Sequence, residues 1–82
     1  MKTSLSILMK TRREAAKMTQ KRLASLMGYS TAQFISNIEA GRAKLPRTKL
    51  KRLSKSLMID RKTIYVHALA DEIETLKRHL NI

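Results

Sequence analysis

The sequence contains no cysteine, one proline and two glycines. Disulfides therefore cannot stabilise the fold, and the lack of cysteine suits a reducing cytoplasm. With few helix breakers among many Leu, Met, Ala, Lys and Arg residues, we expect an all-α fold. Only Tyr29, Phe34 and Tyr65 are aromatic, which is too few for a platform that stacks single-stranded bases.

Long apolar runs are also missing. No stretch approaches the roughly 20 residues of a membrane-spanning helix. The apolar residues at 5–9 are too short a run for a signal peptide, and Lys10 follows them at once. We therefore expect a cytoplasmic protein without a membrane partner. A chain of 82 residues holds one domain with a thin core, which a second subunit would enlarge.

Acidic residues are scarce, and 18 Lys and Arg against 6 Asp and Glu give a net charge of +12. All of the excess lies in residues 1–59, because residues 60–82 hold equal numbers of acidic and basic side chains. This distribution predicts a polyanionic partner for the first part alone. Nucleic acid and an anionic membrane surface both satisfy it, and the alternative is a solvated basic surface without a partner.

Capping residues and periodicity predict five helices, the first over about residues 4–16. Thr19 is a suitable N-cap for a second helix over about 20–27, which Gly28 ends. Ser30, with Gln33 in a capping box, predicts a third helix over about 31–40. A fourth follows the loop around Pro46, and a fifth runs to about residue 80.

The third helix has an unusual outer face. Phe34, Ile35 and Ile38 share one side at 100° per residue, and Gln33, Ser36, Asn37 and Ala40 share the other. A merely solvated helix in so basic a protein would carry Lys or Arg there. We interpret the uncharged polar face as suited to close approach to hydrogen-bonding edges. Two short helices joined by a tight glycine turn are the parts of a helix-turn-helix, although any small helical bundle can contain such a pair.

Residues 5–60 resemble the phage-repressor-like helix-turn-helix family, the group of Cro and the xenobiotic-response-element regulators. The resemblance is carried by residues 18–20, 23–24, 28–30 and 35–41, with Leu50, Leu53 and Leu57 in the next helix. It implies a five-helix, lambda-repressor-like domain that binds double-stranded DNA and regulates transcription, as a repressor or autoregulator. The stretch from Gly28 to Ile35 is one residue longer than the commonest family spacing, so the exact start of the third helix is left open.

The resemblance implies that the third helix reads bases. Gln and Asn can pair bidentately with adenine in the major groove, which makes Gln33 and Asn37 the first candidates. Ser36 can contact a base or a phosphate, and Thr31 and Ala32 lie near the same edge. The alternative for Gln33 is a purely capping role.

The resemblance also implies backbone contacts and one architectural pair. Gln20 lies in the first turn of the second helix, whose free N–H groups favour a phosphate. The basic loop after the third helix would hold the DNA backbone through Arg42, Lys44 and Arg47. Arg13 and Glu39 match positions at which the family places a structural ion pair.

Residues 61–82 form a separate C-terminal helix in this interpretation. Five apolar residues repeat at heptad spacing along it, and Glu72 and Lys77 flank them at g and e positions. We expect these residues to form a homodimer interface that places two domains on half-sites about 34 Å apart. The alternative is that the whole helix packs on its own chain. The heptad residues are Val66, Leu69, Ile73, Leu76 and Leu80.

Other classes of function are less well supported by the residues. His67 and His79 lie on the C-terminal helix, away from any nucleophile, and no metal-ligand cluster or phosphate-binding glycine loop occurs. We therefore expect no enzyme, cofactor, metal or small-molecule substrate. A membrane-surface protein would need one large apolar face opposite a basic one. A protein-binding module, such as an antitoxin that masks a toxin with its C-terminal helix, remains the alternative to a regulator.

Overall fold

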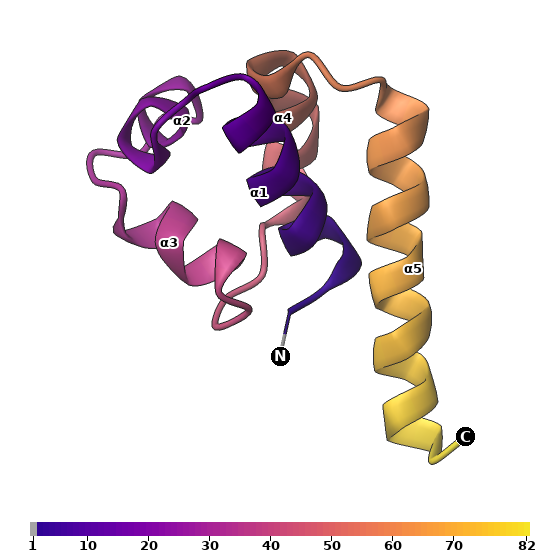
Figure 1. The fold of residues 1–82 in the computed structure, drawn as a ribbon. Helices are drawn as coiled ribbons and strands as arrows, with labels where there is room; N and C mark the ends of the chain where they lie inside the picture. The colour runs from indigo at the N-terminus through magenta and orange to yellow at the C-terminus, as the bar shows by residue number, and fades with distance from the viewer. Residues whose placement is uncertain (1) are drawn as a thin grey trace.

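The computed structural model describes residues 2–82, and these contain five α-helices, one short 3-10 helix and no strand (Figure 1). The elements are α1 (Ser4–Ala15), α2 (Gln20–Leu26), α3 (Gln33–Glu39), η1 (Arg47–Lys49), α4 (Leu50–Leu57) and α5 (Arg61–Leu80). The predicted all-α fold with a long C-terminal helix is therefore confirmed. None of the described helices combines the length and the apolar character that a membrane span requires.

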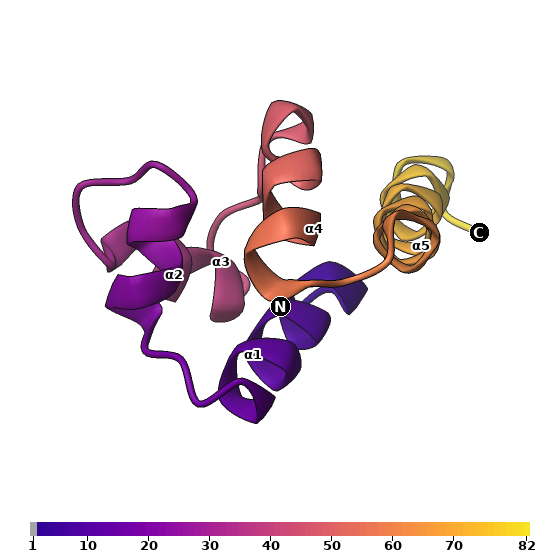
Figure 2. The same ribbon diagram turned by 90° about the horizontal axis from the view of Figure 1, so that it is seen from above.

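The first four α-helices enclose a single core, and α5 lies outside them. In both views α5 lies beyond α1 and α4, on the side away from α2 and α3 (Figures 1 and 2). Each of the first four α-helices contributes one core side chain that is completely buried, and burial of each contributes about 1.5–3 kcal/mol to folding. These residues are Met9, Leu23, Ile35 and Leu53, and Met27, directly after α2, is also completely buried.

Local sequence sets the ends of α2 as predicted. The Thr19 hydroxyl accepts a hydrogen bond from the Arg22 backbone N–H at 3.0 Å, which satisfies one of the free donors at the helix start. Gly28 has φ +85°, a left-handed conformation that side-chain-bearing residues resist. The turn toward α3 therefore begins where the sequence indicates.

The predicted start of α3 is wrong by two residues. Ser30 does not cap the helix and Gln33 forms no capping box, because the N-cap residue is Ala32 and it makes no side-chain cap bond. Residues 30–32 form a turn before the helix, and Tyr29 and Phe34 on either side of it stack with their ring centroids 4.7 Å apart. The Thr31 hydroxyl accepts from the Gln33 N–H at 3.4 Å within that turn.

The helix α5 is attached to the N-terminus of α1. The Asp71 carboxylate accepts hydrogen bonds from the backbone N–H groups of Ser4, at 2.7 Å, and Leu5, at 3.1 Å. A negative group there complements the free donors and positive dipole end of α1. The Ser4 hydroxyl also lies 2.6 Å from Nδ1 of His67, and Ile64 of α5 is buried in the same core as the side chains of the first four helices. One face of α5 thus packs on its own chain.

Candidate nucleic-acid interface

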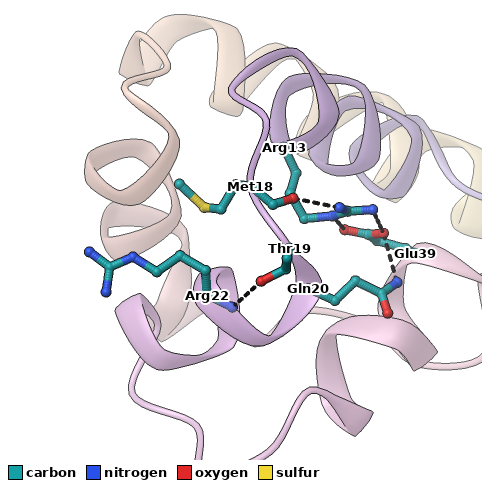
Figure 3. Close-up of polar contacts among 6 residues, drawn as sticks. All are labelled: Arg13, Met18, Thr19, Gln20, Arg22 and Glu39. Carbon is teal, nitrogen blue, oxygen red and sulfur yellow. Dashed lines mark hydrogen bonds and ion pairs between the residues drawn. The ribbon is translucent and has the colours of Figure 1, made fainter.

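A buried ion pair fixes the position of α3 relative to α1 and α2 (Figure 3). Arg13 donates from Nε to one carboxylate oxygen of Glu39 at 2.8 Å and from Nη2 to the other at 3.0 Å. Arg13 is 8% exposed and Glu39 3% exposed. The hydrogen bond to Glu39 raises the pKa of Arg13 above its ordinary value. The bidentate geometry compensates for removing both charges from water.

Two further hydrogen bonds complete this arrangement. Arg13 Nη1 donates to the Met18 carbonyl at 2.7 Å, which ties the end of α1 to the segment before α2 (Figure 3). Gln20 is half-buried, and its Nε2 donates to Glu39 Oε1 at 3.1 Å. Sequence reasoning predicted a phosphate contact for Gln20 and missed this internal hydrogen bond. The phosphate contact stays a prediction, made for a side chain that already bridges α2 and α3.

The outer face of α3 carries its amide side chains away from the core. Ile35 and Ile38 are 0% and 2% exposed and hold the helix on the core. On the opposite side Gln33 is exposed, and Ser36 and Asn37 are half-buried. Gln33 Nε2 donates to Asn37 Oδ1 at 3.1 Å, so the two amides lie side by side one turn apart.

The other two candidate base contacts precede the helix. Thr31 is exposed and Ala32 half-buried, and both lie in the turn between α2 and α3. They adjoin Gln33 in sequence at the N-terminal end of the amide-bearing face. If Thr31 and Ala32 contact bases, they do so from the turn before α3 and not from the first turn of the helix.

The three predicted phosphate-binding cations, two in the loop after α3 and Arg47 at the start of η1, contact different elements. Arg42 donates from Nε to Asn37 Oδ1 at 3.4 Å, toward α3. Lys44 donates from Nζ to the Thr75 hydroxyl at 3.4 Å, and Arg47 forms an ion pair with Glu72, both on α5. All three cations are exposed. The loop thus connects the amide-bearing face of α3 with the C-terminal helix.

Two cations support the turn before α3 in a way that sequence reasoning missed. Arg52 donates from Nε to the Leu26 carbonyl at 2.8 Å, and Lys49 from Nζ to the Met27 carbonyl at 3.2 Å. Positive groups at the end of α2 satisfy free carbonyls and complement the helix dipole. A Cβ atom on Gly28 would lie 3.1 Å from Arg52 Nη1, so this turn packs closely against α4. Periodicity alone places both cations outward, and it gives no signal of these contacts.

The predicted dimer residues lie on the exposed side of α5. Their exposed fractions run from 40% for Leu69 to 67% for Leu80. Beside them lies a groove of about 750 Å³ between α5 and the rest of the chain. Leu69 and Leu76 line one wall of this groove and Leu50 of α4 lines the opposite one. The apolar surface of α5 is therefore continuous with the groove.

The helices α2 and α3 are short and are joined by a glycine turn. The buried ion pair of Arg13 and Glu39 lies behind α3, and cations surround its polar face. These features define a helix-turn-helix DNA-binding domain. A family model described as helix-turn-helix, HTH_3, matches residues 9–62. Because the match spans more than half of the chain, the protein belongs to this DNA-binding family, the Cro and xenobiotic-response-element type, which is typically non-enzymatic. Comparisons with curated proteins and with solved structures gave no match.

Proposed function

We propose that the protein is a sequence-specific regulator of transcription that reads the major groove of double-stranded DNA with α3. The observation that carries this proposal is the outer face of α3, where the exposed Gln33 and the half-buried Asn37 have no charged residue beside them on the helix. A helix fits the major groove, and amide side chains match the donor and acceptor pattern of adenine there. The flanking cations supply the attraction to the phosphates.

Base and backbone contacts divide by position in this proposal. Gln33 and Asn37 read bases, Ser36 contacts a base or a phosphate, and Thr31 and Ala32 face the next base pair, where the Ala32 methyl can pack on thymine. Gln20 at the start of α2 and the loop cations Arg42, Lys44 and Arg47 hold phosphates. These backbone contacts set the register and add affinity on any sequence.

We further propose that the active form is a homodimer joined through α5. The apolar side of this helix and the adjoining groove leave a surface that a monomer would expose to water. Residues 60–82 have equal numbers of acidic and basic side chains. A second copy can therefore approach α5 without the repulsion that two positively charged N-terminal parts would suffer. Two half-sites about 34 Å apart then increase the affinity through linkage.

Repression is the regulatory outcome that needs the fewest contacts. A dimer bound over a promoter excludes other proteins from the same DNA, and no contact with polymerase is required. The proposal therefore favours a repressor or autoregulator over an activator.

Selection of binding sites from random duplex DNA tests the proposal directly. We expect an enriched inverted repeat whose half-site centres lie about one helical turn apart. Enrichment of a single half-site would contradict the proposed homodimer but would agree with sequence-specific DNA binding. Recovery of unenriched sequences at low salt would contradict sequence-specific reading.

A second candidate function is supported by the same exposed side of α5. A partner protein of another kind, as in an antitoxin that masks a toxin, would also cover the apolar residues next to the groove. Sedimentation of the purified chain separates the two. A concentration-dependent dimer supports self-association, and a monomer at high micromolar concentration supports a different protein partner.

A further inference from the structure

Three side chains at the amide-bearing face form a continuous hydrogen-bonded array. Gln33 Nε2 and Arg42 Nε both donate to the same atom, Asn37 Oδ1, at 3.1 and 3.4 Å. Gln33 begins α3, Asn37 lies one turn later, and Arg42 follows the end of the helix. The array therefore spans the face that the proposed function places in the major groove.

The backbone holds Arg42 beside Asn37. Gly41 has φ +81°, which turns the chain back at the end of α3. The backbone N–H groups of Arg42 and Ala43 then donate to the Asn37 carbonyl, at 2.9 and 3.3 Å. Arg42 is thus anchored to the residue whose side chain it contacts, and its position does not depend on the side-chain bond alone.

Arg42 determines which atoms donate and which accept throughout the hydrogen-bonded array. A guanidinium group has only donors, so the asparagine beside it must turn its oxygen toward Arg42. The opposite amide rotamer would set the Nδ2 hydrogens against the Arg42 and Gln33 donors. Because Asn37 Oδ1 then accepts, Gln33 must present its nitrogen to Asn37. The orientation of both amides therefore follows from one cation.

This direction decides which groups remain for a ligand. Asn37 Oδ1 already accepts two hydrogen bonds, which leaves the two Nδ2 hydrogens of Asn37 as donors. Gln33 keeps its carbonyl oxygen as an acceptor and one N–H as a donor. Within residues 2–82 these remaining groups have no other hydrogen-bond partner.

We propose that Gln33, Asn37 and Arg42 form one reading unit, in which Arg42 is a positioning residue that determines base specificity. An adjacent acceptor and donor on Gln33 match N6–H and N7 of adenine. The Asn37 donors match acceptor atoms, N7 and O6 of guanine or O4 of thymine, and reject the N4 amino group of cytosine. This inference rests on the proposed function and assigns Arg42 a role beyond a phosphate contact.

The two roles of Arg42 predict different measurements. A phosphate contact changes the affinity for every sequence by the same factor. A positioning residue changes the preference between bases at positions that it does not touch. The readout is therefore the ratio of affinities for duplexes that differ in one base pair, measured for each variant.

The experiment uses the duplex recovered by the random selection and its single-base-pair variants. The position read by Gln33 is the one whose preference disappears in Gln33→Ala. Arg42→Gln keeps a hydrogen-bonding side chain but can also accept, so the direction of the array is no longer fixed. Arg42→Lys again has only donors, and Lys44→Gln removes a charge from the same loop without contacting Asn37.

We expect the wild-type protein to prefer adenine at the Gln33 position by about tenfold or more. Arg42→Gln should reduce this preference to about threefold or less, and Arg42→Lys should retain most of it. Lys44→Gln should lower the affinity for all duplexes equally and leave the preference unchanged. An unchanged adenine preference in Arg42→Gln would overturn the inference while leaving the proposed function intact. A wild-type protein without preference at any position would overturn the proposed function itself.

Discussion

The helix-turn-helix part of the chain and the helix α5 differ in what their exposed surfaces contain. In residues 2–59 most apolar side chains are buried or half-buried, and the ion pair of Arg13 and Glu39 is joined by further hydrogen bonds. On α5 only Ile64 is buried, and large aliphatic side chains stand in solvent. The first part is thus complete within one chain, whereas α5 presents a surface suited to another protein.

Charge separates the same two regions. The whole net charge of +12 belongs to residues 1–59, and the remainder is neutral. A basic surface with an uncharged reading face suits DNA, and a neutral apolar helix suits a second copy. The loop after α3 connects them, because Arg42 contacts α3 while Lys44 and Arg47 contact α5.

The largest expected effect tests the claim that the first part is complete within one chain. Glu39→Ala leaves the buried Arg13 guanidinium without its carboxylate, and we expect the free energy of unfolding to fall by about 3–5 kcal/mol. Chemical denaturation measures this loss. Glu14→Ala, an exposed acid on the same helix as Arg13, should change stability by less than about 0.5 kcal/mol. Equal effects of the two variants would show that the ion pair of Arg13 and Glu39 does not hold α3 in place.

The next effect tests the claim that α5 needs a partner. Leu76→Gln should weaken the dimer by about 1.5–3 kcal/mol, because an apolar side chain buried between subunits is lost. Leu76 is 60% exposed in the single chain, so the fold of the monomer should be unaffected. Sedimentation equilibrium gives the dissociation constant, and Glu74→Gln on another face of α5 is the control. A wild-type-like constant for Leu76→Gln would place the interface elsewhere.

A smaller effect comes from a polar atom inside the first part. The Tyr29 hydroxyl is buried and has no hydrogen-bond partner among the described residues. Tyr29→Phe keeps the stack on Phe34 and should raise the free energy of unfolding by about 1 kcal/mol. Thermal or chemical denaturation at pH 7 checks this, and a loss of stability would reveal a partner for the hydroxyl.

The burial of Tyr29 also predicts that the free energy of unfolding depends on pH in the alkaline range. Burial raises the pKa of Tyr29 above its ordinary value of 10.0, so the folded chain keeps the phenol proton at a pH where the unfolded chain loses it. The contribution of Tyr29 to stability is therefore constant below pH 10 and falls as pH rises through the folded-state pKa. The difference in free energy of unfolding between Tyr29→Phe and the wild-type protein should therefore grow above pH 10. A difference that stays constant with pH would contradict the raised pKa of Tyr29.

The smallest effect tests the connection between the two regions. Glu72 pairs with Arg47 at the surface, and exposed pairs contribute about 0–1 kcal/mol. Glu72→Gln frees Arg47 for a phosphate, so we expect DNA affinity to rise by up to about fivefold, with a steeper salt dependence. Glu74→Gln removes the same charge from another face and controls for the general field. Identical gains in both variants would show that the Arg47 contact is irrelevant to DNA binding.

The sequence predicts those parts of the fold that depend on near neighbours. Thr19 and Gly28 mark the ends of α2 because capping and left-handed backbone are properties of single residues. The start of α3 is missed because residues 30–32 form a turn, flanked by the stacked rings of Tyr29 and Phe34, in place of a helix start capped by Ser30.

The candidate site divides in the same way. Helical periodicity places Gln33 and Asn37 on the outer face of α3. It does not show that Arg42 fixes the direction of their amides, nor that Gln20 is hydrogen-bonded to Glu39. Those contacts depend on how the chain turns after Gly41 and how α2 packs on α3, which a linear pattern does not contain.

The proposed function requires that the amide-bearing face of α3 distinguish one DNA sequence from another. The most direct test compares Gln33→Ala with the wild-type protein on the selected duplex and on random duplex DNA at the same salt concentration. We expect Gln33→Ala to lose about 1–3 kcal/mol of binding free energy on the selected duplex and almost none on random DNA. Equal losses on the two duplexes would contradict it, because Gln33 would then contribute to affinity without reading a base.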